Sequence, residues 1–303
     1  MSEKSKVWFG KLLLLIATLI WGASFLILKN TIDKLPFAFV LAVRFGTAFV
    51  VLALIFPKKL RMTKKDFLHG LLTGIWLALA YFIQTWGLDY TTPSKNAFLT
   101  TTYTFIVPFL SWIFFHKKLN IYNMVAGTLS LLGILLVCFG DGEGFQLGDA
   151  LTILCGVFYA LQIITLNSYA KETDPLRITM VEFLVCAVLF SLFSAIFELP
   201  HTTLEIDGRA WLSLGYLAFF ATCAAQLMQA QGLKWVSSGQ GSLILSLESV
   251  FGTLFSVVIG GEVLGWKVAV GFAVIFVAIV VGETELRFLR RKKKNKKVDF
   301  REK

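Results

Sequence analysis

Residues 70–119 read GLLTGIWLALAYFIQTWGLDYTTPSKNAFLTTTYTFIVPFLSWIFFHKKL, and a second copy of this stretch follows at residues 215–264. The two copies match at a constant offset along the chain. The matched positions include Gly70 and Gly215, Ala80 and Ala225, Gln84 and Gln229, Gly87 and Gly232, Thr101 and Ser246, and Leu119 and Leu264. Each copy consists of two apolar runs joined by a short polar hinge. The chain is therefore an internal duplication.

The composition places the chain in a membrane. Of 303 residues, 56% are hydrophobic and only 16% are charged, which leaves too little polar surface for a soluble globule of this size. The apolar runs reach the length of about 20 residues that a transmembrane helix needs. The sequence predicts an all-α polytopic protein that is integral to a membrane, and we expect the cytoplasmic membrane of a bacterium.

Further apolar runs flank the two copies, so that the sequence predicts ten transmembrane helices, five in each half. The expected spans are the run that contains residues 12–28, then about 36–56, 68–88, 96–115, 121–139, 150–169, 176–197, 210–231, 236–259 and 266–281. We divide the chain into a first five-helix repeat at 1–140, an extracytoplasmic linker at 141–147, a second repeat at 148–283 and a basic tail at 284–303.

The positions of Lys and Arg predict the orientation. Most of the 29 Lys and Arg residues fall in segments that face the cytoplasm if the N-terminus is inside. Because each repeat has an odd number of spans, the second repeat then crosses in the opposite sense, and both termini are cytoplasmic. Inverted repeats are typical of secondary transporters, which bind their substrate at the repeat interface. The tail is rich in Lys and Arg, and we expect it to lie on anionic lipids.

Several short motifs make the chain resemble a known family. They are WGASF at residues 21–25 followed by Lys29, the pair Arg44 and Phe45, and GEVL at residues 261–264. With the duplicated five helices, these motifs resemble the EamA type of the drug/metabolite transporter superfamily. The resemblance implies export or exchange of small metabolites, often amino acids, through a central cavity. It also implies that the fifth and tenth helices pack at the periphery.

Three fully ionisable side chains lie inside predicted spans and away from the span ends, where a charge is costly unless it meets a partner or water. They are Arg44, Glu182 and Glu248. At a rise of about 1.5 Å per residue, Arg44 and Glu248 both come out roughly 12 Å from the outer edge of the bilayer. We expect them to pair, either as part of a substrate site or as a structural ion pair. Arg44 can neutralise only one of the two carboxylates, so the other lacks a counter-ion. Glu248 and Glu182 are therefore candidates for proton coupling.

Polar and aromatic residues at matched positions predict the lining of the cavity. Gln84 and Gln229 need hydrogen bonds from each other, from a substrate or from water. The expected cavity residues are Trp21, Arg44, Tyr81, Gln84, Tyr103, Tyr159, Gln229 and Glu248. Close helix packing is the alternative for the small residues beside them. Gly87 and Gly232 are candidate hinges for a rocking of spans one to four against spans six to nine.

The sequence favours no other class of function. The histidines stand singly, the four cysteines lie in apolar runs, and no HExxH, GxSxG or phosphate-binding motif is present. We expect no enzyme activity, no cofactor, no metal and no nucleic-acid partner, because the net charge of +10 is concentrated in the tail. The expected partner is a small-molecule substrate, and the protein is a monomer or a homodimer. A lipid-translocating or sensor protein of similar architecture is the alternative.

Overall fold

The computed structural model describes residues 2–116, 121–139, 145–204 and 206–284, and within these ranges it contains helices and no strand. The first half contains α1 (Glu3–Ile32), α2 (Phe37–Ile55), the 3-10 turn η1 (Pro57–Leu60), α3 (Lys64–Asp89), α4 (Pro93–Thr100), α5 (Thr102–Phe115) and α6 (Ile121–Phe139). Most of the expected linker at 141–147 lies outside the described residues. The basic tail with its expected lipid contacts also lies outside them, except for its first residue, Thr284.

The second half repeats this order with two π-helical segments. It contains α7 (Leu147–Tyr169), α8 (Pro175–Phe193), η2 (Ser194–Glu198, π-helix), η3 (Leu199–His201), α9 (Gly208–Tyr216), η4 (Leu217–Ala224, π-helix), α10 (Ala225–Trp235), α11 (Ser238–Leu245), α12 (Leu247–Val258) and α13 (Trp266–Thr284). Among the described residues, eight helical segments are long and apolar enough to cross a membrane, and α6 and α13 are two further apolar helices. The protein is therefore an integral membrane protein.

Capping side chains explain why some helices begin earlier than the apolar pattern predicts. The helix α3 begins at Lys64 rather than at Leu68, because Thr63 and Asp66 form a capping box. The Thr63 hydroxyl accepts from the Asp66 N–H at 3.1 Å, and the Asp66 carboxylate accepts from the Thr63 N–H at 3.0 Å. Such a box stabilises a polar first turn, and a hydropathy window leaves that turn out.

The fourth and ninth spans are broken, although the sequence predicts one continuous helix for each. The breaks fall at Thr101 and Ser246, which are matched positions of the duplication. The Thr101 hydroxyl donates to the carbonyl of Phe98 at 2.7 Å, and the Ser246 hydroxyl donates to the carbonyl of Leu243 at 2.7 Å. Such a hydrogen bond often bends a helix, and at these two positions it accompanies the break. Broken helices near the middle of the membrane are a feature of many transporter sites.

The first helices of the two halves run in opposite directions. Near the start of α1, Gly10 lies against Gly232 in α10. Near the end of α7, Asn167 donates a hydrogen bond to the carbonyl of Leu233 at 2.8 Å. The start of α1 and the end of α7 therefore meet the same end of α10, which makes α1 and α7 antiparallel. We call this end of the molecule the α1-start end. An inverted repeat requires this arrangement.

The first helix of each half packs against a helix of the other half. A Cβ atom built on Gly10 in α1 would lie 3.1 Å from the carbonyl oxygen of Gly232 in α10, and one built on Gly148 in α7 would lie 2.8 Å from that of Gly87 in α3. Such close approach of two backbones is typical of glycine contacts between membrane helices. Gly87 and Gly232, the expected hinges, thus lie inside helices at equivalent contacts, and the two halves are interlocked.

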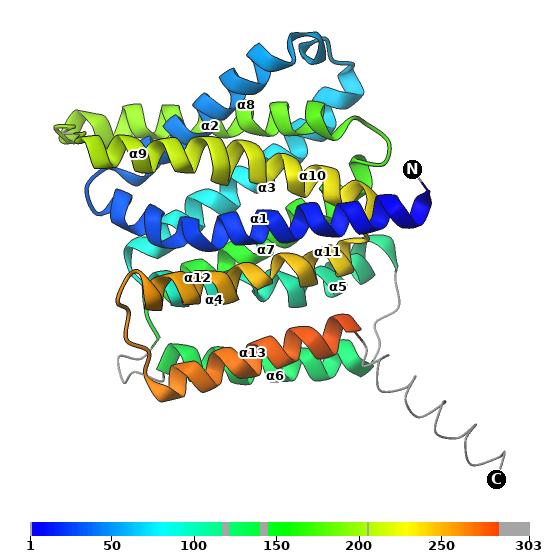
Figure 1. Ribbon diagram of the computed structural model, residues 1–303, viewed down its shortest axis with the longest axis vertical. Coiled ribbons are helices and arrows are strands. Elements are labelled where there is room, and N and C mark those ends of the chain that lie inside the picture. The colour runs from blue at the N-terminus through cyan, green and yellow to red at the C-terminus, as the bar shows by residue number, and fades with distance from the viewer. Residues whose placement is uncertain (1, 117–120, 140–144, 205, 285–303) are drawn as a thin grey trace.

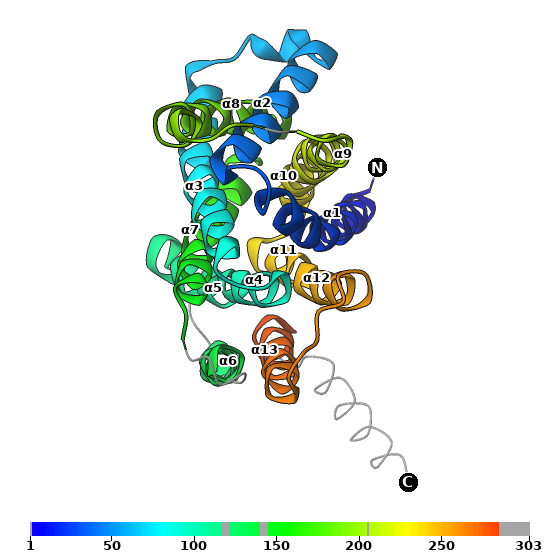
Figure 2. The same ribbon diagram turned by 90° about the vertical axis from the view of Figure 1, so that its left-hand side faces the viewer.

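The helices α6 and α13 lie side by side at one edge of the molecule (Figures 1 and 2). Gly133 and Gly271 bring their backbones together, since a Cβ on Gly133 would lie 3.0 Å from the carbonyl oxygen of Gly271. This is the peripheral position that the family resemblance implies for the fifth and tenth spans.

The surface of the bundle is more apolar than that of a soluble protein, and the largely apolar interior holds a few charged side chains. Large apolar side chains point outward, and Leu54 and Leu212 are 76% and 77% exposed. Arg44, Glu182 and Glu248 are buried inside the bundle. Lipid accepts the apolar surface, while the protein has to satisfy the interior polar groups itself.

Candidate functional site

A cavity lies between the two halves in the interior of the bundle. Helices of both halves line it. Its walls contain all eight residues that the sequence predicts for the cavity, namely Trp21, Arg44, Tyr81, Gln84, Tyr103, Tyr159, Gln229 and Glu248. Pockets for small organic molecules have an apolar lining with a few polar groups. The lining of this cavity matches that class.

Two hydrogen bonds in the cavity join residues at matched positions of the duplication. Tyr103 donates from its hydroxyl to Glu248 Oε1 at 3.1 Å, and Gln226 donates from Nε2 to the hydroxyl of Tyr81 at 2.9 Å. Each pair is separated by 145 residues, the offset of the repeat. Equivalent residues meet each other only next to the symmetry axis that relates the two halves. The cavity therefore lies on this axis.

Arg44 does not form the expected ion pair with Glu248. Its Nε donates to the Thr222 hydroxyl at 3.1 Å, and the carbon of its guanidinium group lies 5.2 Å from the centre of the Tyr81 ring. Its Nη1 is buried without a hydrogen-bond partner, while Glu248 accepts from Tyr103. The depth estimate was wrong on this point because it gives the level of a residue in the membrane, and not the direction of its side chain.

The π-helical segment η4 supplies contacts to two cavity residues. The Thr222 hydroxyl, which accepts from Arg44, donates to the carbonyl of Leu217 at 2.8 Å, and the carbonyl of Ala221 accepts from Trp21 Nε1 at 2.7 Å. The matched part of the first half lies inside the regular helix α3. Short π-segments often occur at functional sites, and here the segment anchors one side chain from α1 and one from α2.

Gln84 and Gln229 do not bond to each other. Gln84 accepts from the Tyr159 hydroxyl at 2.7 Å and donates to the Thr100 hydroxyl at 2.9 Å. Gln229 donates to Gln162 Oε1 at 3.4 Å, and its own Oε1 is buried without a partner. Gln84 is thus satisfied within the protein, while Gln229 retains a free acceptor beside the cavity.

Glu182, the second candidate for proton coupling, lies outside the cavity lining. It is fully buried in α8, and its Oε1 accepts from Gln162 Nε2 at 3.1 Å. In the part of the chain that the structure describes, no cluster of three or more His, Cys, Asp or Glu side chains could hold a metal ion.

The sequence pattern missed several polar groups of the site. Gln226 lines the cavity, and Thr222 holds Arg44. Gln226 carries a sequence signal, because it lies three residues before Gln229 and at the position that matches Tyr81. Thr222 carries none, since it matches Leu77 in the first half.

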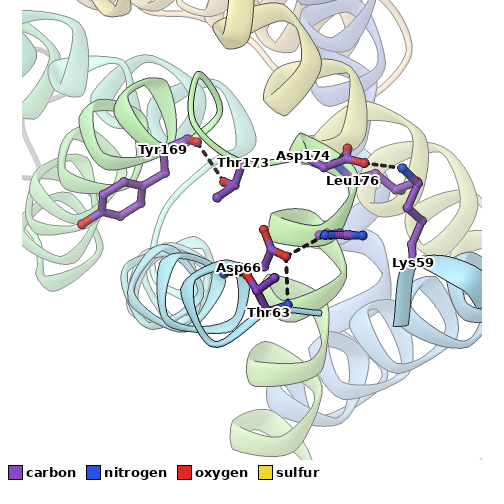
Figure 3. A network of polar contacts seen from close by, with 8 residues as sticks. Lys59, Thr63, Asp66, Tyr169, Thr173, Asp174 and Leu176 are labelled. Carbon is purple, nitrogen blue, oxygen red and sulfur yellow. Dashed lines mark hydrogen bonds and ion pairs between the residues drawn. The ribbon is translucent and has the colours of Figure 1, made fainter. Parts of the chain in front are cut away.

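Ion pairs join the two halves at the α1-start end (Figure 3). Lys59 in η1 pairs with Asp174, which precedes α8, and Arg177 Nη1 donates to Asp66 Oδ2 in α3 at 2.7 Å. Burial alone would raise the pKa of Asp174. Hydrogen bonds from Lys59 and from the Leu176 N–H outweigh this effect and hold that pKa below its usual range.

At the opposite end, different polar contacts bridge the halves. The carboxylate of Glu198, at the end of η2, accepts from the N–H groups of Ala38 and Phe39 at 2.9 Å each. Lys34 pairs with Asp207 at 3.1 Å. Both ends of the molecule are thus tied by contacts that involve the first two connections of each half.

Comparisons with known proteins agree with this architecture. The chain is 32% identical over 286 residues to an uncharacterised transporter of Archaeoglobus fulgidus, with 92% of this chain and 87% of that protein covered. It is 22% identical to the uncharacterised transporter YyaM of Bacillus subtilis, with 91% and 94% covered. A solved crystal structure at 19% identity has the same fold, with a TM-score of 0.71 over 95% of this chain and 99% of that one.

The EamA-like transporter family matches the chain twice, at residues 8–139 and 146–282. One match falls in each half, as the duplication predicts. The resemblance drawn from the short motifs is confirmed, and the chain belongs to the EamA-like transporter family.

Proposed function

We propose that this protein exports or exchanges small zwitterionic metabolites, amino acids or close relatives, by alternating access. One observation carries the proposal: Arg44 and Glu248 line the same buried cavity and do not neutralise each other. A charged side chain that is buried in a membrane protein needs a partner of opposite charge. A zwitterion brings a carboxylate for Arg44 and an ammonium group for Glu248.

The remaining lining supports a small organic substrate. Trp21, Phe25, Tyr81 and Tyr159 supply aromatic surface, which binds apolar side chains and, through the ring faces, cationic groups. Arg44 Nη1 and Gln229 Oε1 offer a free donor and a free acceptor. The site thus combines a broad apolar wall with a few directed polar groups.

The proposal includes a topology. The described helices, the antiparallel first helices and the distribution of Lys and Arg support ten membrane crossings in two inverted repeats, with both termini in the cytoplasm. The α1-start end is then the cytoplasmic end. We expect the protein in the cytoplasmic membrane of a bacterium.

The interlocked halves favour moving units that each contain spans of both repeats. The helix α1 packs mainly on α10 and α12, and α7 packs mainly on α3 and α5. A motion of the first half against the second would break both sets of contacts. We therefore propose that these two sets of helices tilt relative to each other and open the cavity to one side at a time.

Transport of amino acids by purified protein in liposomes tests the proposal. We expect radiolabelled amino acids to accumulate transiently in liposomes loaded with the same unlabelled amino acid, and empty liposomes to show no such counterflow. If no amino acid moves but a fluorescent lipid crosses between the leaflets, the protein is a lipid translocator. If neither moves, a sensor is the better description.

The ion pairs at the proposed cytoplasmic end should depend on pH. The pKa of Asp174 is depressed in the folded protein, so the pair with Lys59 is present above the ordinary carboxyl pKa of about 3.9 and is lost as the pH falls below it. Exposed pairs contribute about 0.2–1 kcal/mol, so we expect the loss of this pair to lower the free energy of unfolding by at most about that amount.

Unfolding of the purified protein at neutral and at acidic pH measures this contribution. Asp174→Asn should lower the free energy of unfolding at neutral pH by about 0.2–1 kcal/mol and should respond less to acid than the wild type. Asp33→Asn, which removes a pair within one helix end at the other side, is the matched control and should keep the acid response of the wild type. An acid response of Asp174→Asn equal to that of the wild type would contradict the assignment.

A further inference from the structure

Glu182 is a buried carboxyl group for which the substrate cavity gives no role. It lies in the middle of α8 with no exposed surface. Its Oε1 accepts from Gln162 Nε2 at 3.1 Å, while its Oε2 is buried without a partner. An ionised carboxylate in the interior of a membrane protein is costly without a cation or full hydrogen bonding.

No charged group of the described helices packed around Glu182 faces it. The polar side chains beside its carboxyl group are Gln162 from α7 and Thr73 from α3, and its titratable neighbour is Cys186 on its own helix. On α2, the guanidinium group of Arg44 is bound to Thr222.

The other titratable groups on the surrounding elements are engaged elsewhere or lie toward the helix ends. On α3, Asp66 pairs with Arg177 and His69 stacks on Tyr169, and on η1, Lys59 pairs with Asp174. Lys58 on η1 and Lys234 at the end of α10 lie near that same end, and Glu198 on η2 caps α2 at the other end. Glu182 therefore has no counter-ion among these groups.

Thr73 shows which protonation state the surroundings suit. Its hydroxyl is close to the carbonyl oxygens of His69 at 2.9 Å and Gly70 at 3.2 Å, and it donates its one hydrogen to them. Toward Glu182 the hydroxyl can then only accept a hydrogen bond. A protonated carboxyl group supplies the donor that Thr73 lacks, whereas a carboxylate would place two acceptors against each other.

We propose that Glu182 is a proton-binding site of this transporter, separate from the substrate cavity and occupied by a proton in the conformation described here. The nearest polar group, the Gln162 amide, points an N–H at the carboxyl group. An N–H group repels a metal cation, so this arrangement favours a proton over a sodium ion. Release of the proton to water leaves one negative charge on Glu182 and changes no other bond.

A chain of two glutamines connects Glu182 with the cavity. Gln162 donates to Glu182, and its own Oε1 accepts from Gln229 Nε2 at 3.4 Å. Gln229 lines the cavity. When Glu182 loses its proton, the hydrogen bond that it accepts from Gln162 strengthens. The Gln162 side chain is then drawn toward Glu182, which changes the hydrogen bond between Gln162 and Gln229. This step, which couples proton and substrate, rests on the proposed function, whereas proton binding by Glu182 does not.

Infrared spectroscopy of the purified full-length protein in lipid tests proton binding directly. A protonated carboxyl group gives a C=O band that a carboxylate lacks, and we expect such a band to disappear as the pH is raised. Glu182→Gln should remove the contribution of Glu182 to this band, and Glu248→Gln, which changes the buried carboxyl group of the cavity, should retain that contribution. An undiminished band in Glu182→Gln, or one that is reduced only in Glu248→Gln, would overturn the proposal.

A second variant keeps the test decisive if Glu182→Gln fails to fold. Thr73→Val keeps the shape of the side chain and removes the acceptor of the carboxyl proton, so the band should move in frequency. A band that stays in place would show that Thr73 does not face the protonated carboxyl group. A purely structural role of the hydroxyl would leave the carboxyl band unchanged.

Labelled amino acids in proteoliposomes test the coupling. A gradient of one pH unit should drive wild-type accumulation by up to about tenfold, while Glu182→Gln should retain counterflow and lose the response to the gradient. Counterflow without any response in the wild type would overturn the coupling. Absence of all amino acid flux would refute the proposed function instead, and the infrared band would still decide whether Glu182 binds a proton.

Discussion

Replacement of Arg44 by glutamine is expected to weaken the apparent affinity for amino acid substrates by about ten- to hundredfold. A hydrogen bond to a charged group contributes about 1.5–3 kcal/mol, and about 1.4 kcal/mol corresponds to a factor of ten. The guanidinium group is the cation in the cavity wall and has a free Nη1. Glutamine can keep the contact with Thr222 but carries no charge. The concentration dependence of counterflow in liposomes measures the effect.

Two controls separate substrate binding from structure. Arg61→Gln removes an exposed arginine in the connection between η1 and α3, and it should leave the affinity unchanged. The double variant Arg44→Glu, Glu248→Arg keeps the net charge of the cavity but exchanges the positions of the two charges, and it should abolish transport of the zwitterion. Wild-type affinity in Arg44→Gln, or transport by the double variant, would contradict the assigned role.

Replacement of Gly22 by alanine is expected to lower the stability of the protein by about 1–3 kcal/mol, the usual cost of overpacking. A Cβ atom at this position in α1 would lie 2.4 Å from the Cβ of Phe251 and 3.0 Å from the backbone nitrogen of Gly252 in α12. Neither atom can move without a shift of the helix. Thermal unfolding in detergent, followed by protein fluorescence, measures the loss.

Gly46 provides the matched control, because a Cβ atom there would meet no atom within 4 Å. It lies inside α2, where alanine is favoured over glycine by about 0.5–1 kcal/mol. Gly46→Ala should therefore raise the unfolding temperature slightly, while Gly22→Ala lowers it. Equal shifts in the two variants would show that α1 and α12 are not in the described contact.

The helical membrane fold and the set of cavity residues could be predicted from the sequence because the duplication carries both. Apolar length gives the spans, and the offset that matches Gln84 with Gln229 also places polar residues of both halves on equivalent helix faces. Tyr103 and Glu248 show this best. They are matched in the sequence, and they form a hydrogen bond with each other.

The details that escaped prediction depend on hydrogen-bond geometry, to which hydropathy is insensitive. Thr101 and Ser246 are apolar enough in context to continue a span, yet the helix is interrupted at both, where their hydroxyls bond to helix carbonyls. The stretch around Thr222 forms a π-helix, whereas the matched stretch of the first half is a regular part of the α-helix α3. Arg44 turns toward Thr222 rather than Glu248, which no estimate of depth can show.

The exchange of first helices between the halves affects how the protein is made. Span α1 enters the membrane at the start of translation, but its glycine neighbour Gly232 in α10 leaves the ribosome only near the end. Until then the contact between Gly10 and Gly232 is missing, and α1 can pack only on α2, α3 and α4 of its own half. Assembly must therefore finish after synthesis, and a ribosome that stalls before the eighth span would leave an unfinished bundle for quality-control proteases to recognise.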